Sequence, residues 1–267
     1  MLDKLIIMKI ATWNVNSINS RKELFLKWLA KNKPEIVLLQ ETKSVDNAFP
    51  KSEIEERGYN IVLNGQKTYN GVAILSKFPI DESIKTFANN PVAGEARYLE
   101  SVITVKEKTI RVISVYVPNG AGIDDSRYKI KLKFLDALRV HMNNLLKLDE
   151  IALIGGDFNV APEEVDTYNV EASRDSVLFD IEVRKKFRSL LHLGYYDSFR
   201  VIHPSKVEFT WWDYRAASWY HNRGLRIDHI LLSPEACDLL KDVKIDRNLR
   251  ASVKPSDHVP VICELEL

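Results

Sequence analysis

The segment Ile151-Ala-Leu-Ile-Gly-Gly-Asp-Phe-Asn159 combines a buried-strand pattern with two polar residues. Its four apolar residues predict a short buried strand, and the two glycines predict its end. Asp157 and Asn159 follow at once, where a rigid scaffold can hold side chains that face solvent. A carboxylate there can hold a water or a metal ion, and an amide can donate to a phosphate oxygen. The same residues also fit a simple turn, so the rest of the chain must distinguish a site from a turn.

The composition is that of an ordinary globular protein. The 267 residues are 45% hydrophobic and 28% charged, enough for one large domain with a substantial core. A net charge of +1 gives no overall positive field, so binding to nucleic acid would need local charge asymmetry. Cys237 and Cys263 form neither a metal-ligand spacing nor a disulfide framework. No apolar run reaches the roughly 18–20 residues of a membrane span, and 5–8 is too short for a signal peptide. We therefore expect a cytoplasmic protein with no membrane partner.

Strand-like segments are spread along the whole chain and outnumber the helical ones. The apolar patterns predict strands near residues 8–14, 35–40, 59–63, 71–76, 99–105, 109–117, 228–232 and 259–266. They predict helices near residues 18–32, 126–147, 179–192 and 234–241. This distribution favours a single α/β domain over residues 1–267. The basic run within 126–147, which includes Lys129, Lys131 and Lys133, fits either a solvated helix face or part of a DNA-facing surface.

Acidic or amide side chains stand at the ends of predicted strands five times. They are Asn14, Glu41, Asp157 with Asn159, Asp228, and Asp257 with His258. If they converged, their carboxylates would repel one another unless a cation or a proton were present. Oxygen ligands of this kind suit Mg²⁺ or Mn²⁺ better than zinc. The set therefore favours a hard-cation site for phosphoryl transfer, although each acid alone also fits a solvated or capping residue.

Six motifs in order make the sequence recognisable. They are Trp13-Asn-Val-Asn16, Leu39-Gln-Glu-Thr42, Tyr116-Val-Pro-Asn119, Gly155-Gly-Asp-Phe-Asn159, Asn222-Arg-Gly-Leu-Arg-Ile-Asp228 and Ser256-Asp-His258. Together they resemble the exonuclease III family of magnesium-dependent abasic-site endonucleases, most closely its bacterial exonuclease III branch. The resemblance implies an α/β fold with four αββα layers, a two-sheet β-sandwich flanked by helices, as in the deoxyribonuclease I-like superfamily. The family's usual start resembles Met8-Lys-Ile10, which leaves 1–7 as an N-terminal extension.

The same resemblance implies a role for each matching residue. For the metal, Glu41 would be the principal Mg²⁺ ligand, helped by Asn16 and Asp257, with Asp157, Asn159 and His258 completing the candidate set. For the reaction, Asp228 and His258 would form a carboxylate–imidazole pair, Asp157 would orient or deprotonate the attacking water, Asn159 would hold a phosphate oxygen, Asn14 would position Asp157, and Tyr116 would act on the phosphate. Such a set suits phosphodiester hydrolysis, which needs an aligned nucleophile and charge stabilisation.

A second group of residues would contact DNA. The resemblance implies Asn119, Trp211, Arg215, Arg223, Leu225, Arg226 and Ile227. Among these, Arg223 and Arg226 would grip phosphates, whereas Trp211, Leu225 and Ile227 would line a small pocket for a sugar without a base. The alternative is that the aromatic residues around 211–219 simply belong to the core.

The favoured function is cleavage of the backbone 5′ to an abasic site in double-stranded DNA, with trimming of damaged 3′ ends. The expected cofactor is Mg²⁺, with Mn²⁺ able to substitute, and the expected state is a monomer. One alternative is another superfamily phosphodiesterase, acting on inositol phosphates or sphingomyelin. A second is a non-catalytic nucleic-acid-binding relative similar to the catabolite repression control protein. The exonuclease III form of the loop at 211–228 disfavours the first, and the retained acids disfavour the second.

Overall fold

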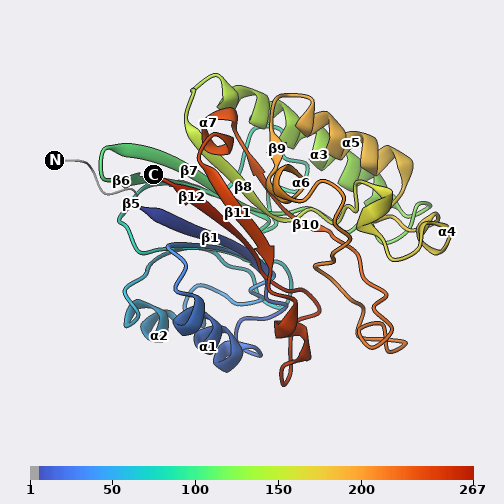
Figure 1. The fold of residues 1–267 in the computed structure, drawn as a ribbon, viewed down its shortest axis with the longest axis horizontal. Helices are drawn as coiled ribbons and strands as arrows, with labels where there is room; N and C mark the ends of the chain where they lie inside the picture. The colour runs from blue at the N-terminus through green and yellow to red at the C-terminus, as the bar shows by residue number, and fades with distance from the viewer. Residues whose placement is uncertain (1–5) are drawn as a thin grey trace.

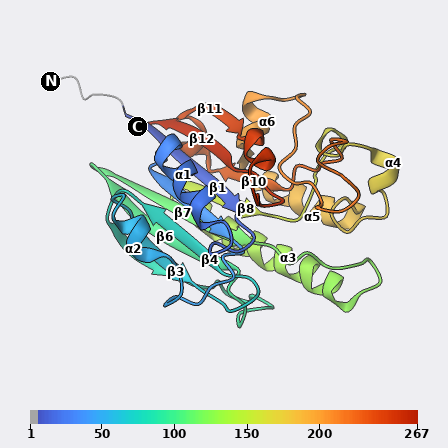
Figure 2. The same cartoon turned by 90° about the horizontal axis from the view of Figure 1, so that it is seen from below.

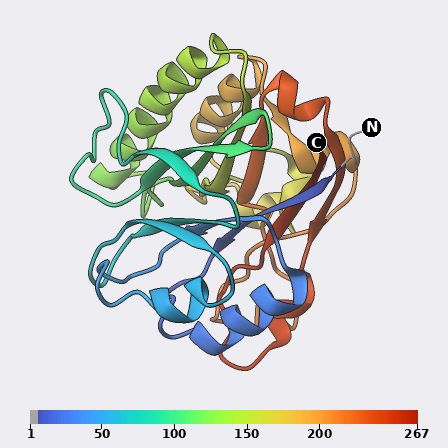
Figure 3. The same cartoon turned by 90° about the vertical axis from the view of Figure 1, so that its left-hand side faces the viewer.

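Two six-stranded sheets pack face to face in this computed structural model, which describes residues 6–267 (Figures 1 and 3). The first sheet has the order β11 (Leu240–Ile245), β12 (Val261–Glu266), β1 (Ile7–Asn14), β2 (Ile36–Gln40), β4 (Val72–Ser76) and β3 (Asn60–Asn64). The second has the order β5 (Ile80–Ile84), β6 (Tyr98–Val105), β7 (Lys108–Tyr116), β8 (Ile151–Asp157), β10 (Asp228–Leu232) and β9 (Tyr196–Asp197). The predicted two-sheet sandwich is confirmed.

Helices lie on both sides of the sandwich (Figure 1). They are α1 (Lys22–Asn32), α2 (Lys51–Glu55), α3 (Ser126–Leu146), α4 (Val170–Ser173), α5 (Ile181–Leu191), α6 (Ser198–Ile202) and α7 (Pro234–Cys237), with the 3₁₀ turns η1 (Glu164–Asp166) and η2 (Arg247–Ala251). Figure 2 shows α1 and α2 over the first sheet, and Figure 1 shows α3 and α5 on the opposite side of the molecule. Within residues 6–267, none of the helices combines the length and apolar character needed to cross a bilayer.

Successive side chains of β2 point to opposite faces of its sheet, and both faces are covered by other elements, which explains the four layers. Ile36 and Leu38 point into the apolar cluster between the two sheets. Val37 and Leu39 point the other way, into the cluster shared with α1. A strand with both faces buried reads as a continuous apolar run, which is the pattern of residues 36–39. A third cluster fills the space between the second sheet and the helices α3 and α5.

The pairing of the strands brings the polar strand ends to one edge of the sandwich. The pairs β1–β2 and β7–β8 are parallel, so Asn14, Gln40, Tyr116 and Asp157 end their strands at the same edge. Strand β10 runs antiparallel to β8 and contributes its first residue there, with Asp228 opposite Asp157. The convergence of these residues is thus a consequence of topology.

Gly155 and Gly156 do not end the strand, contrary to the sequence prediction, because β8 continues through both to Asp157. A Cβ on Gly155 would lie 2.6 Å from Leu38 Cδ1 of the facing sheet, and one on Gly156 would lie 1.9 Å from the carbonyl oxygen of Val115. Both distances are too short for a side chain. The glycines therefore allow the two sheets, and the neighbouring strands, to approach closely just before Asp157.

Three other predictions of element boundaries need correction. The first helix begins at Lys22, not near 18, because residues 17 and 18 donate backbone hydrogen bonds to Glu41 and Thr42. The helix predicted over 234–241 ends at Cys237, and β11 begins at Leu240, where it pairs with β12. Of the predicted extension 1–7, Ile6 exchanges two backbone hydrogen bonds with Leu267, and Ile7 begins β1. Residues 1–5 lie outside the described part of the chain.

Candidate active site

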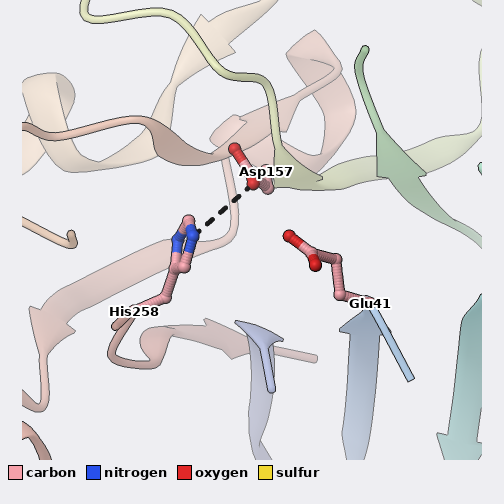
Figure 4. Close-up of side chains that lie close together, drawn as sticks. All are labelled: Glu41, Asp157 and His258. Carbon is pink, nitrogen blue, oxygen red and sulfur yellow. Dashed lines mark ion pairs between the residues drawn. The ribbon is translucent and has the colours of Figure 1, made fainter. Parts of the chain in front are cut away.

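Glu41, Asp157 and His258 face one another at the polar edge of the sandwich (Figure 4). One ligand atom from each lies within 4.8 Å of the others. Glu41 follows β2, Asp157 ends β8, and His258 precedes β12, so both sheets contribute to the group. Asp157 and His258 are almost completely buried, and Glu41 is partly exposed. The geometry thus brings these three strand-end side chains together.

Asp228 and His258 form the expected carboxylate–imidazole pair. The imidazole Nδ1 lies 2.9 Å and 3.1 Å from the two oxygens of Asp228, and Nε2 points to Asp157 Oδ2 at 3.7 Å. Burial opposes a positive charge on the ring, but Asp228 and Asp157 outweigh it and raise the pKa of His258 to about 10. The imidazole is therefore a cation at neutral pH, placed between two carboxylates.

Asp157 is held in place by backbone and side-chain donors. The amide of Asn14 donates to Asp157 Oδ2 at 2.9 Å, and the backbone N–H of Asn159 donates to Oδ1 at 2.8 Å. Burial raises the pKa of Asp157 to about 7; the positive charge of His258 opposes the shift, and the charges of Asp228 and Glu41 add to it. A carboxyl group with this pKa can accept a proton at neutral pH.

The surroundings of Glu41 suit a cation. Lys43 Nζ lies 2.8 Å from Glu41 Oε2 and 2.6 Å from Asn16 Oδ1. The Asn16 amide donates to Asp257 Oδ1 at 2.9 Å, so the oxygen-bearing side chains form one connected group. Burial would raise the pKa of Glu41, but Lys43 and the hydrogen bond from Asn14 lower it below the usual value. These oxygens are the donors that Mg²⁺ and Mn²⁺ prefer.

His258 lies close to Glu41 and Asp157, but it is less suited than they are to bind a cation. Its Nδ1 is engaged by Asp228, and the raised pKa keeps both ring nitrogens protonated. Glu41, Asn16 and Asp257 therefore fit a hard cation better than the group that includes the imidazole.

Tyr116, Asn119 and Asn159 border the site on the side of the second sheet. The Asn119 amide donates to Asn159 Oδ1 at 3.0 Å, and the Asn159 amide donates to the Val117 carbonyl at 2.9 Å. Burial, with the charges of Glu41 and Asp157, raises the pKa of Tyr116 well above its usual value. Its phenol stays a proton donor at neutral pH. The roles predicted for the three side chains stay predictions.

Backbone conformation also marks the site. Asn16, Glu41, Lys43 and Asn159 have φ of 43°, 48°, 49° and 52°, in the left-handed region that non-glycine residues rarely adopt. Such conformations concentrate at functional sites, where surrounding contacts compensate their strain. At Glu41 the compensation includes hydrogen bonds from the N–H of Ser17 to its carbonyl and from the N–H of Thr42 to Gly71.

Trp211 belongs to the site. Its indole Nε1 donates to Asp257 Oδ2 at 3.0 Å, and its ring lies 6.4 Å from that of His258. Backbone bridges join it to Leu225 on one side and to His258 on the other. Leu225 and Ile227 are buried in the cluster beside the second sheet, and Trp211 packs against that cluster. The three predicted pocket residues are thus adjacent, and their role in binding DNA stays a prediction.

Arg226 is not a surface residue, and its predicted grip on phosphate is wrong. It is 1% exposed. Its guanidinium donates to Asp166 Oδ1 at 2.6 Å and pairs with Asp197 Oδ2 at 2.8 Å. An arginine enclosed between two carboxylates cannot reach a DNA backbone. By contrast, Arg223 is exposed, and Arg215 is exposed and paired with Asp213 at 2.7 Å.

Two lysines that lie near the site were given no site role from the sequence. Lys43 touches Glu41 and Asn16, and its position two residues after the motif Leu39-Gln-Glu41 could have drawn attention to it. Lys131 was placed in a surface run of basic residues, but it is completely buried. Its Nζ contacts the carbonyl oxygens of Asn119, Asn159 and Val177. Burial lowers its pKa to about 7, against the charges of Asp157 and Asp180.

Comparison with known proteins agrees with this geometry. The sequence pattern that defines the endonuclease/exonuclease/phosphatase family matches residues 11–258. The chain belongs to this family. It is 32% identical to an exodeoxyribonuclease III of Haemophilus influenzae, an alignment that covers 97% of this chain and all of the relative.

Solved structures of this family superpose over nearly the whole chain. An AP endonuclease from Archaeoglobus fulgidus matches with a TM-score of 0.92 and 35% identity, and the 3′-5′ exonuclease NExo from Neisseria meningitidis with a TM-score of 0.93 and 38% identity. Each match covers 97% of this chain and 100% of the other. Both relatives share the two-sheet fold and are similar to this chain over its full described length.

Proposed function

We propose that this protein is a DNA-repair nuclease that hydrolyses the phosphodiester bond 5′ to an abasic site in double-stranded DNA. The observation that supports the proposal most is the joint placement of Asp157, Glu41 and the Asp228–His258 pair at one edge of the sandwich. The family membership agrees with it, because relatives named exodeoxyribonuclease III and AP endonuclease match over nearly the full chain.

Each side chain of the site then has one task. Asp157, held by Asn14, orients the attacking water and accepts its proton. The protonated imidazole of His258, kept charged by Asp228, stabilises the negative charge that grows on the phosphate oxygens. Tyr116 donates a hydrogen bond to the same group. Asn159, whose amide also donates to the Val117 carbonyl, holds a phosphate oxygen with its remaining N–H.

The oxygen-rich group around Glu41 is the place for a divalent cation, and we propose Mg²⁺, with Mn²⁺ able to substitute. Glu41, Asn16 and Asp257 would hold the ion, with Lys43 displaced from between them. When bound, the ion polarises the phosphoryl oxygen and helps the leaving oxyanion. In the absence of the ion, Lys43 supplies the positive charge that keeps the carboxylates together.

We also propose that the same site trims damaged 3′ ends. Two structures of the 38% identical Neisseria protein support this extension, one described as a 3′-5′ exonuclease and the other as a 3′ phosphatase bound to a product DNA hairpin. Both reactions break a bond between phosphorus and a deoxyribose 3′ oxygen, which belongs to a phosphodiester at the abasic site and to a phosphomonoester at a 3′-phosphate. A cytoplasmic location and a monomeric state stay predictions from the sequence.

The experiment compares three DNA substrates with the purified protein in Mg²⁺. They are a duplex with one tetrahydrofuran abasic analogue, the same duplex with a normal nucleotide, and a nicked duplex with a 3′-phosphate. We expect a single nick 5′ to the analogue, removal of the 3′-phosphate, and slow or no cleavage of the intact duplex. Loss of all reaction in EDTA is expected as well.

Controls separate this function from its alternatives. Inositol polyphosphate and sphingomyelin should release no phosphate or phosphocholine above the buffer rate, and turnover of either would favour the other phosphodiesterases. The variant His258→Asn should bind the abasic duplex but cut it roughly 10²–10⁴-fold more slowly. Binding without cleavage by the unmodified protein would identify a non-catalytic relative and contradict the proposal.

A further inference from the structure

Lys131 lies in the first two turns of α3 and is completely buried. Its Nζ is 2.6 Å from the carbonyl oxygen of Asn159, 2.8 Å from that of Val177 and 3.1 Å from that of Asn119. An ammonium has three N–H donors, and here three carbonyls accept them. All hydrogen-bonding capacity of the side chain is therefore used, and none of it reaches solvent.

The three carbonyls come from three different segments. Asn119 follows β7, Asn159 follows β8, and Val177 lies between α4 and α5. The first two segments also contact each other through the hydrogen bond from the Asn119 amide to Asn159 Oδ1. Lys131 thus joins the loops at the carboxyl ends of the two parallel strands of the second sheet, from the side opposite the site.

The loop after β7 is shaped around the lysine. Gly120 has a φ of +96°, and a Cβ on it would lie 3.1 Å from Lys131 Cδ. A side chain at 120 would press on the aliphatic part of Lys131 and strain the backbone. The close contact indicates that the loop can pack on Lys131 only with a glycine at position 120.

Burial of an ammonium is unfavourable unless its hydrogen bonds and charge are compensated. A helix residue that served packing alone could be apolar at lower cost. In this molecule the cation lies directly behind the turn Asp157–Asn159, whose backbone N–H at Asn159 holds Asp157 Oδ1. A shift of that turn would displace both Asp157 and Asn159.

We propose that Lys131 is a positioning residue for the reaction: it fixes the carbonyls of Asn119 and Asn159, and so sets the side chains that face the phosphate. The inference rests on the proposed nuclease function and assigns Lys131 no contact with DNA. Removal of the ammonium frees the two loops, and displacement of a catalytic group by about 1 Å can lower a rate about 10²-fold.

The test uses Lys131→Met, which keeps most of the volume and removes all three donors. A charge-matched control is Lys108→Met, at the other end of β7, roughly 26 Å from Tyr116 at ~3.3 Å per residue. We expect kcat on the tetrahydrofuran duplex to fall about 10²-fold in Lys131→Met and to stay within about 2-fold in the control. KM and the affinity for the same duplex in EDTA, measured by fluorescence anisotropy, should change less than about 3-fold.

A coupling measurement distinguishes positioning from a general structural role. In an Asn159→Ala background, Lys131→Met should lower kcat by a smaller factor than in the unmodified protein, because one of the side chains that it positions is already absent, while the contribution through Asp157 remains. Full additivity of the two effects in log kcat would overturn the proposal. So would a change of about one in the slope of log affinity against log salt, which would show that the lysine contacts a phosphate.

A second variant covers the case in which Lys131→Met does not fold. Lys131→Gln keeps two N–H donors on a shorter side chain, so we expect a smaller loss of kcat and the same coupling to Asn159. Unchanged kcat in a folded Lys131→Gln or Lys131→Met variant refutes the role. If the unmodified protein does not cut the abasic duplex at all, the proposed function fails instead, and the two failures remain distinct.

Discussion

Asp157→Asn should make the metal-free protein more stable at neutral pH while abolishing cleavage. The carboxyl group is 1% exposed, and burial raises its pKa from 3.8 to about 7. The folded protein therefore holds this proton more tightly than the unfolded chain does. The associated stability is complete below pH 3.8 and is lost as the pH rises toward 7. An asparagine has no proton to lose and should show no such decline.

The size of the effect follows from the shift. A change of about three pKa units corresponds to about 4 kcal/mol at pH 7, of which about 2 kcal/mol falls between pH 5 and pH 7. The free energy of unfolding of the variant at a single pH also contains a second effect. The N–H groups of Asn14 and Asn159 both donate to the Asp157 carboxylate, and an amide in its place can accept from only one of them. The change with pH is independent of that loss.

The assay is urea unfolding in EDTA, followed by tryptophan fluorescence, at pH 5, 6 and 7. The difference in free energy of unfolding between Asp157→Asn and the unmodified protein should shift by about 2 kcal/mol in favour of the variant across this range. Asp175→Asn, which changes an exposed carboxylate in the same way, should show no shift. A difference that stays constant with pH would refute the assigned electrostatics of the site.

Three further predictions concern activity. Glu41→Gln should raise the Mg²⁺ concentration needed for half-maximal nicking by orders of magnitude without loss of folding, and an unchanged Mg²⁺ titration would remove Glu41 from the metal site. Asp228→Asn and His258→Asn should each lower the rate roughly 10²–10⁴-fold, and the double variant little more, so that additivity in single-turnover assays would argue against a coupled pair. Trp211→Ala should reduce nicking at the abasic analogue about 5- to 150-fold, for a contact of roughly 1–3 kcal/mol; a lower melting temperature with an unchanged ratio of abasic to intact cleavage would make Trp211 a core residue.

The sequence predicted most of the strands, but not β5, β9 or β11, and it placed acids at the strand ends, because these signals are local. A run such as Ile36–Leu39 shows burial on both faces, and Glu41 follows it at a fixed distance along the chain. The convergence of Asn14, Glu41 and Asp157 is different, since it depends on two parallel strand pairs in two sheets. No spacing along the chain encodes that pairing, and only the order of the family motifs suggested it.

The errors at Arg226 and Lys131 share one physical cause. Arg226 and Lys131 were both assigned to the surface because charged side chains are rarely buried. Their partners lie far away in the sequence: Asp166 is 60 residues from Arg226, and the carbonyl of Asn159 is 28 residues from Lys131. A buried charge is tolerable only when such partners are present. The sequence alone could not supply them.

The balance of charge links these buried groups to the reaction. At the site, the carboxylates of Glu41, Asp157, Asp228 and Asp257 face two cations, Lys43 and His258, which leaves two negative charges uncompensated when all four acids are ionised. A divalent cation offsets that excess, and in its absence burial, together with the neighbouring carboxylates, raises the pKa of Asp157. A phosphodiester then brings one more negative charge to this edge. Lys131 lies outside this balance, buried in contact with the carbonyl of Asn159. Because it acts on the position of that turn and does not meet the phosphate, its loss should appear in kcat and hardly at all in the affinity for DNA.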